Sequence, residues 1–132
     1  MRLVLCVALF AALAAEAAGS STVTVNVTSK QKVFTATVTH PDPLPVEQLH
    51  VWTVRLFDRK HHAVTRARIK VTGDMPAHGH GLPTAPVAVA RGHGVYQLQG
   101  MMFQMPGLWY VQLRVRAGSR LDTLRIKFTI PE

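Results

Sequence analysis

Hydrophobic and polar residues alternate along most of the chain after residue 21. In the segment 22–28, TVTVNVT, valine occupies every second position, and residues 108–116 alternate in the same way. A period of two is typical of half-buried β-strands, because successive side chains of a strand project to opposite faces. The pattern predicts eight strands: 22–28, 32–40, 49–57, 67–71, 86–90, 95–103, 108–116 and 121–131.

Glycine and proline separate or interrupt these segments. The three prolines of residues 41–45 predict a rigid break, and Gly100 predicts a bend or bulge inside its strand. Beyond the N-terminal segment, no stretch has the apolar period of a helix. Seven to eight short antiparallel strands in a chain of this size predict an all-β, immunoglobulin-like β-sandwich, with Trp52 and Trp109 in its core. A small closed barrel is the alternative.

The first residues have the layout of a secretory signal peptide. Arg2 precedes an apolar run, and the small residues at 15 and 17 fit the cleavage rule for such segments. The run of about 13 residues is shorter than the roughly 20 that a spanning helix needs, which disfavours the alternative of a retained membrane anchor. We therefore expect a signal peptide over residues 1–17, one domain over residues 18–132, and a periplasmic or secreted location.

The distribution of reactive side chains limits the chemistry of the domain. The only cysteine, Cys6, lies within the leader, so the exported domain has no thiol and any metal site must use His, Met, Asp or Glu. The serines lie near the ends or in turns and the carboxylates are scattered, so we expect that the protein is not an enzyme. A metal-dependent hydrolase with Asp74 beside His78 and His80 stays an alternative.

The chain is basic, with a formal net charge of +8. In an exported protein this charge favours an anionic membrane surface or an acidic partner protein, and we expect no nucleic acid. If the last two strands pair, four cations share one exposed face: Arg114, Arg116, Arg125 and Lys127. Like charges opposite each other disfavour pairing, and an anionic partner would relieve them. The alternative is that salt and water screen these charges.

The loop MPAHGHGLPT, residues 75–84, contains the most distinctive group of residues in the chain. His78 and His80 project to the same side of an extended segment, glycines let the backbone curl, and prolines stiffen its flanks. Imidazole suits copper, zinc and nickel, and thioether selects Cu(I), so Met75 with the two histidines predicts a copper site. The alternatives are an exposed connection without a ligand and a recognition surface for another protein.

Further donors for this site come from elsewhere in the chain. His93 lies in a predicted turn, and Met102 points away from the side shared by Met101 and Met105, which we expect to fill the core. His50 is either a further ligand or a buried histidine bonded to a loop carbonyl. The expected metal ligands are Met75, His78, His80, His93, Met102 and His50.

The stretch from Leu49 to Phe128 resembles the YtkA-like / FixH-like group of exported bacterial proteins. The resemblance is carried by LHVWTV (49–54), GDMPAHGHGLPTAP (73–86) and GVYQLQGMMFQMPGLWYVQLRV (94–115). The chain departs from the group after its first tryptophan strand, where DRKHH (58–62) replaces the usual Asp-Gly type of turn.

The resemblance implies a single immunoglobulin-like domain. FixH-like members are associated with the assembly of copper-containing respiratory oxidases, so the resemblance implies a copper-binding accessory protein whose partner is a copper-containing membrane oxidase or another envelope protein. The alternative function is a metal-free interaction module of a membrane or envelope complex.

Overall fold

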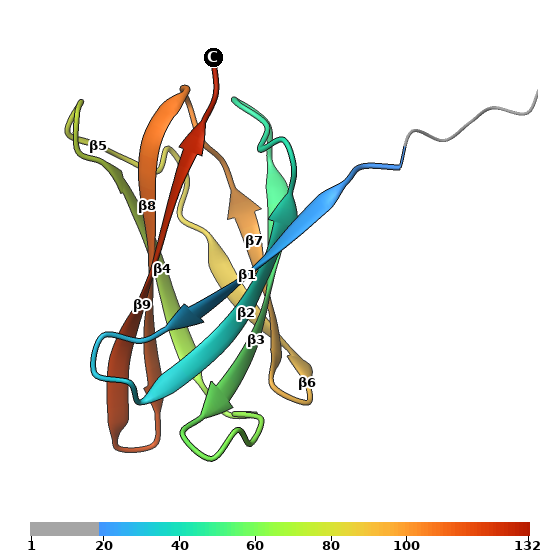
Figure 1. Cartoon of the computed structure of the whole chain (residues 1–132), viewed down its shortest axis with the longest axis vertical. Helices are drawn as coiled ribbons and strands as arrows, with labels where there is room; N and C mark the ends of the chain where they lie inside the picture. Colours follow the sequence, from blue (N-terminus) through green and yellow to red (C-terminus); the bar gives the residue numbers. More distant parts are fainter. Residues whose placement is uncertain (1–18) are drawn as a thin grey trace, which may run out of the picture.

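The computed structural model describes residues 19–132, and over that range the chain forms β-strands and no helix (Figure 1). The predicted signal peptide lies outside the described residues. Within residues 19–132, no helix is long and apolar enough to cross a membrane. The strands are β1 (Thr22–Thr28), β2 (Phe34–Pro41), β3 (His50–Asp58), β4 (Arg68–Met75), β5 (His80–Gly81), β6 (Val87–Gly92), β7 (Val95–Met101), β8 (Gly107–Ala117) and β9 (Arg120–Ile130).

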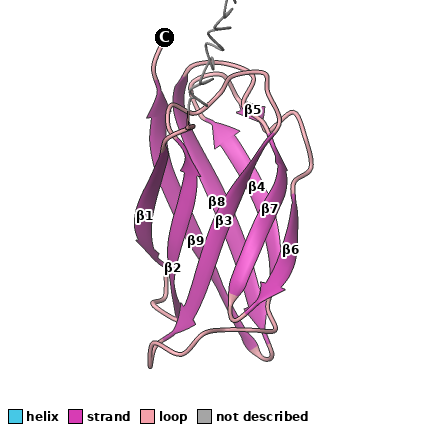
Figure 2. Ribbon diagram, turned by 90° about the vertical axis from the view of Figure 1, so that its right-hand side faces the viewer, coloured by secondary structure: helices cyan, strands magenta, loops and turns pink. Residues whose placement is uncertain are grey.

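The strands form two antiparallel layers that are almost closed into one sheet. One layer has the order β1-β2-β3-β7-β6, and the other has the order β4-β8-β9 with β5 added beside β4. A single residue pair, Lys70 with Val87, joins the layers through β4 and β6. On the other side, β1 and β9 lie side by side (Figure 2). The expected all-β sandwich is confirmed. The single-pair junction between its layers brings it close to the closed barrel that was the alternative.

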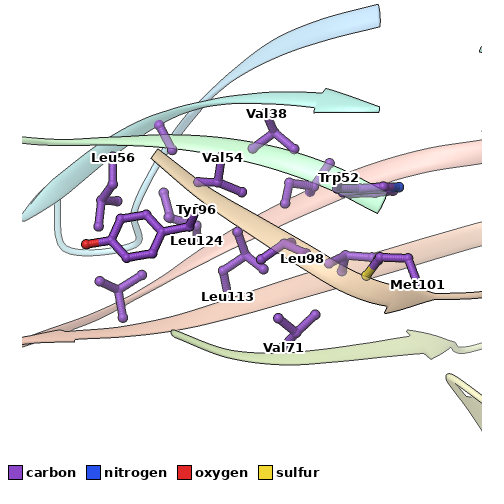
Figure 3. Close-up of a cluster of buried hydrophobic side chains, with 14 of the residues drawn as sticks. Val38, Trp52, Val54, Leu56, Val71, Tyr96, Leu98, Met101, Leu113 and Leu124 are labelled. Carbon is purple, nitrogen blue, oxygen red and sulfur yellow. The ribbon is translucent and has the colours of Figure 1, made fainter. Parts of the chain in front are cut away.

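The core lies between the two layers and is built from the inward positions of the alternating segments. Trp52 and Trp109 are both completely buried, as the alternation predicts. Phe103 lies between them, with its ring centroid 5.9 Å from that of Trp52 and 5.2 Å from that of Trp109. Figure 3 shows Trp52 and Met101 at one end of this core and Tyr96 near the other.

A buried carboxylate fixes the β1–β2 connection to β9. Asp122 accepts hydrogen bonds from the Ser29 hydroxyl at 2.5 Å and from the backbone amides of Gln31 and Thr123 at 2.9 and 2.8 Å. Burial opposes the ionisation of Asp122, but these bonds outweigh it and hold the pKa of the carboxyl below its usual range.

The pattern predicts a strand that ends at Val71, whereas β4 continues to Met75. Its last residues pair with β8 up to Asp74 opposite Tyr110. Gly73 belongs to this extension, and a Cβ at that position would lie only 2.8 Å from Cγ of Leu82. An alanine there would require Leu82 or the backbone to shift, so the packing of Leu82 against the core favours a glycine at this position.

Candidate functional site

The histidine loop forms a tight hairpin at one end of the sandwich. Met75 pairs with His80 and Asp74 pairs with Gly81, so the chain reverses between β4 and β5. Gly79 adopts a positive φ of 63° inside this reversal, a conformation that glycine adopts without a steric penalty. We call this end of the molecule the β5 end; it lies at the top of Figure 1.

The hairpin brings the two imidazoles of His78 and His80 together. Their ring centroids are 5.8 Å apart, the rings are within 17° of parallel, and both residues are exposed. The hairpin therefore places two nitrogen donors side by side on its exposed surface, and these are the candidate ligands of a metal site.

Met75 has a different environment from the two histidines. Its side chain is only 2% exposed, and its methyl group occupies the space where a Cβ of Gly107 would lie. The structure thus gives the Met75 thioether a packing role beneath the hairpin, and its sulfur is not presented to solvent with the rings.

His93 lies far from the hairpin. It occupies the turn between β6 and β7 with a positive φ of 54°, at the end of the molecule opposite β5 (Figure 1). The structure therefore does not bring His93 to the other expected ligands. The sequence alone does not show that the β6–β7 turn lies at the end opposite β5, so it could not exclude His93 as a ligand.

The connection between β7 and β8, residues 102–106, crosses the β5 end. Gln104 donates a hydrogen bond from its side chain to the carbonyl oxygen of Gly81 at 3.2 Å, and the Phe103 carbonyl accepts one from the amide of Glu47 at 2.8 Å. Met102 and Met105 are half-buried in this connection. The connection is thus hydrogen-bonded both to the hairpin and to the β2–β3 connection.

His50 begins β3 at the same end and faces the interior. Its Nδ1 lies 3.0 Å from the carbonyl oxygen of Gln48, which agrees with the expected bond to a loop carbonyl. Its Nε2 is buried and has no hydrogen-bond partner. The pKa of His50 lies below its usual value. Burial lowers this pKa most, and His40 lowers it a little further, whereas the bond to the Gln48 carbonyl raises it.

His40 is a further inward histidine that the sequence reasoning left unassigned. It is 8% exposed, its ring centroid is 4.9 Å from that of Trp52, and its Nδ1 lies 2.8 Å from the Pro41 carbonyl oxygen. A signal was available, because His40 continues the inward series of Phe34, Ala36 and Val38 along one strand.

No group of three or more His, Cys, Asp or Glu side chains that could hold a metal ion occurs within residues 19–132. The nitrogen donors that the structure brings together are the two imidazoles of His78 and His80. Imidazole suits a borderline ion better than a hard one, since hard cations prefer several oxygen ligands.

The outer face of the β4-β8-β9 layer is more strongly basic than the sequence pattern alone predicts. Arg68 pairs directly with Arg116, and Lys70 pairs directly with Arg114. The face also carries Lys127 and Arg125, whose guanidinium carbon lies 3.7 Å from the centroid of the Tyr110 ring. Like charges directly opposite each other on neighbouring strands repel, and an anionic surface placed against this face would relieve that repulsion.

Comparison with known proteins gives one match. The model of the YtkA-like family matches residues 17–114, which include all strands from β1 to β7 and most of β8. Searches among curated proteins and among solved structures found no match. The YtkA-like resemblance seen in the sequence is confirmed, and its FixH-like part stays a prediction.

Proposed function

The chain belongs to the YtkA-like family, and from that premise we propose that it is an exported accessory protein that binds copper through His78 and His80 and passes it to an envelope protein. The observation that supports this proposal is the pair of near-parallel, exposed imidazoles 5.8 Å apart on a closed hairpin. Preorganised ligands bind with a smaller ordering cost than ligands on a mobile loop.

The chemistry of the donors favours copper. Imidazole binds Cu(I) and Cu(II), and copper forms the most stable complexes among the divalent first-row ions. The exported domain has no cysteine, so it can hold Cu(I) without a thiol that would oxidise or cross-link. Two protein ligands leave positions open, and an incoming donor from a partner can occupy them before the ion leaves. A copper-containing membrane oxidase is the partner that this proposal favours.

The experiment is copper competition between a chromogenic chelator and the tag-free protein recovered from its own envelope. We expect the variant His78→Ala/His80→Ala to bind one copper ion fewer per chain than the wild type. The matched control is His62→Ala/His93→Asn, which removes two histidines at the opposite end and places at position 93 a residue that tolerates positive φ. Equal copper content in all three proteins would overturn the proposal.

A second candidate function is attachment to an anionic membrane surface through the basic face. The direct pairing of Arg68 with Arg116 and of Lys70 with Arg114 supports it, since acidic headgroups would relieve the repulsion. This role is compatible with copper delivery to a membrane enzyme. Binding to vesicles that contain acidic lipid, and not to zwitterionic vesicles, tests it. The remaining alternative, a metal-free interaction module, predicts partner binding that does not depend on His78 or His80.

A further inference from the structure

The border between β4 and β6 is the narrowest junction between paired strands of the sheet. Within the described chain these strands meet at one register pair, Lys70 with Val87, whereas β6 pairs with β7 along its length. On the β5 side of this junction, Leu82 lies against Gly73 of β4. On the other side, the segment 88–90 of β6 has no register partner on β4 in the described chain, so it presents one open backbone edge at the border of its layer (Figure 2).

Strand β6 has few of the features that usually protect such an edge. Its sequence VAVARG has no charge before Arg91, and Val87 is 61% exposed. Native edge strands are commonly protected by charged side chains, proline or bulges, because their unpaired N–H and C=O groups can pair with a strand of another chain. In β6 the proline, Pro86, precedes the strand, and the bulge lies at its far end, between Ala90 and Gly92. The middle of the strand is therefore free to accept a partner.

An open groove lies beside this edge. It has a volume of about 470 Å³ and is lined by residues 67–71 on one side and 85–88 on the other. Ile69 and Ala88 are half-buried and pack against the core from the inner face of the two strands. A strand laid in the groove would therefore bury small apolar side chains against this apolar floor.

The charges around the groove indicate the kind of strand that fits it. Arg68 and Lys70 are exposed on β4, Arg66 is exposed just before them, and the lining residues include no carboxylate. Opposite charges on neighbouring strands stabilise their pairing. Because side chains of a strand alternate between its faces, one segment can present carboxylates outward to these cations and small apolar side chains inward.

We propose that the β6 edge and the groove beside it bind an extended, acidic segment of another protein as an added β-strand. The backbone of that segment pairs with residues 88–90, and its carboxylates face Arg68 and Lys70. Main-chain hydrogen bonds supply affinity in this mode of recognition, and the alternating side chains supply specificity. The inference goes beyond the proposed function and does not depend on copper, since the edge lies on the side of Lys70 away from the β4–β5 hairpin.

The probe is a blocked peptide of about six residues in which glutamate and valine alternate, a common length for a strand. It is added to the full exported chain, isotope-labelled, tag-free and without metal. We expect changed amide NMR shifts at residues 88–90, and slower hydrogen exchange at the amides there that the β7 ladder leaves unpaired. A peptide with lysine in place of glutamate should not bind. An acidic peptide with an N-methylated backbone, which keeps the charge but cannot donate hydrogen bonds, should not bind either.

Substitutions beside the groove test the assigned cations. Arg68→Gln/Lys70→Gln should weaken binding of the acidic peptide about fivefold or more, because two exposed ion pairs are lost. The matched control is Arg125→Gln/Lys127→Gln, which removes the same charge from exposed positions of the same layer. These positions are two strands away from β4, where salt screens them, so binding should change by less than about twofold.

The remaining outcomes overturn the inference. Equal binding of the N-methylated peptide, or shifts confined to β8 and β9, would show that charge alone attracts the peptide to the basic face. Shifts at residues 88–90 that grow with protein concentration in the absence of peptide would assign the edge to a second copy of the chain. Unchanged signals at residues 88–90 with the acidic peptide would show that the edge accepts no such strand. Copper content that does not depend on His78 and His80 would refute the proposed function and leave this inference intact.

Discussion

The imidazole rings of His78 and His80 lie 5.8 Å apart and within 17° of parallel. The hairpin that carries them is closed by the pairing of Met75 with His80, and Leu82, which follows it, packs against Gly73 of β4. The geometry of the exposed pair therefore depends on packing several residues away from the rings, which makes that packing testable.

Replacing Gly73 by alanine should loosen the hairpin. The new Cβ would lie 2.8 Å from Cγ of Leu82, so either the side chain or the hairpin must move. Overpacking of this kind costs about 1–3 kcal/mol. Urea unfolding should show the loss, and Gly73→Ala/Leu82→Ala should recover part of it relative to the sum of the single variants. Strict additivity of the two substitutions would argue against this contact.

Asp122 should be important for stability because it satisfies several amides of the β1–β2 connection. Asp122→Ala leaves those buried donors without an acceptor and should lower the free energy of unfolding by about 2–3 kcal/mol. Asp122→Asn, which keeps one acceptor oxygen, should cost less. Equal losses in the two variants would show that the hydrogen bonds are not the cause.

The same carboxyl should make stability depend on pH in acid. Its pKa in the folded chain is below the ordinary value of 3.8, so the unfolded chain binds more protons as the pH falls past that value. The stabilisation from Asp122 is complete above about pH 4 and is lost as the pH falls through the folded pKa. In urea titrations, Asp122→Asn should show a shallower loss over this range than the wild type.

His50 should cost stability in the metal-free protein. Its buried Nε2 lacks a partner, and removing such an atom without leaving a cavity recovers about 1–3 kcal/mol of desolvation. His50→Phe should therefore raise the free energy of unfolding of the metal-free chain. A clear destabilisation, with the fold retained, would mean that the bond between Nδ1 and the Gln48 carbonyl outweighs the unpaired Nε2, or that Nε2 has a favourable partner in solution.

The basic face should bind acidic vesicles in a salt-dependent manner. Arg114→Gln/Arg116→Gln removes two cations that face Lys70 and Arg68 across the ladder. At about 1 kcal/mol per cation near an acidic membrane, affinity should fall on the order of 30-fold. Vesicle sedimentation measures this, and Arg55→Gln/Lys60→Gln, which changes the charge equally away from this face, is the control. Equal binding by both variants would indicate attraction by net charge alone.

Much of the sandwich could be predicted because its strands alternate. Trp52 and Trp109 occupy inward positions in regular segments, and both are buried as expected. The extension of β4 to Met75 and the short β5 could not be predicted in this way, since they depend on pairing with β8 and on the packing of Leu82. Local periodicity contains no information about such distant partners.

The candidate site was predictable only in part. The sequence predicts His78 and His80 on one side of an extended segment, whereas the structure places them in a tight turn, and it is the turn that brings the two rings together. The spacing does not show that Met75 is buried against Gly107 or that His93 lies at the opposite end. The packing of His40 against Trp52 depends on the register of β2 with β3, which the local pattern does not contain.

The central claim is that His78 and His80 hold copper, and the copper-to-protein ratio tests it most directly. We predict about one copper ion per chain in the wild type and almost none in His78→Ala/His80→Ala, since two imidazoles are the ligands expected to be lost. The same copper content in both proteins would contradict the account.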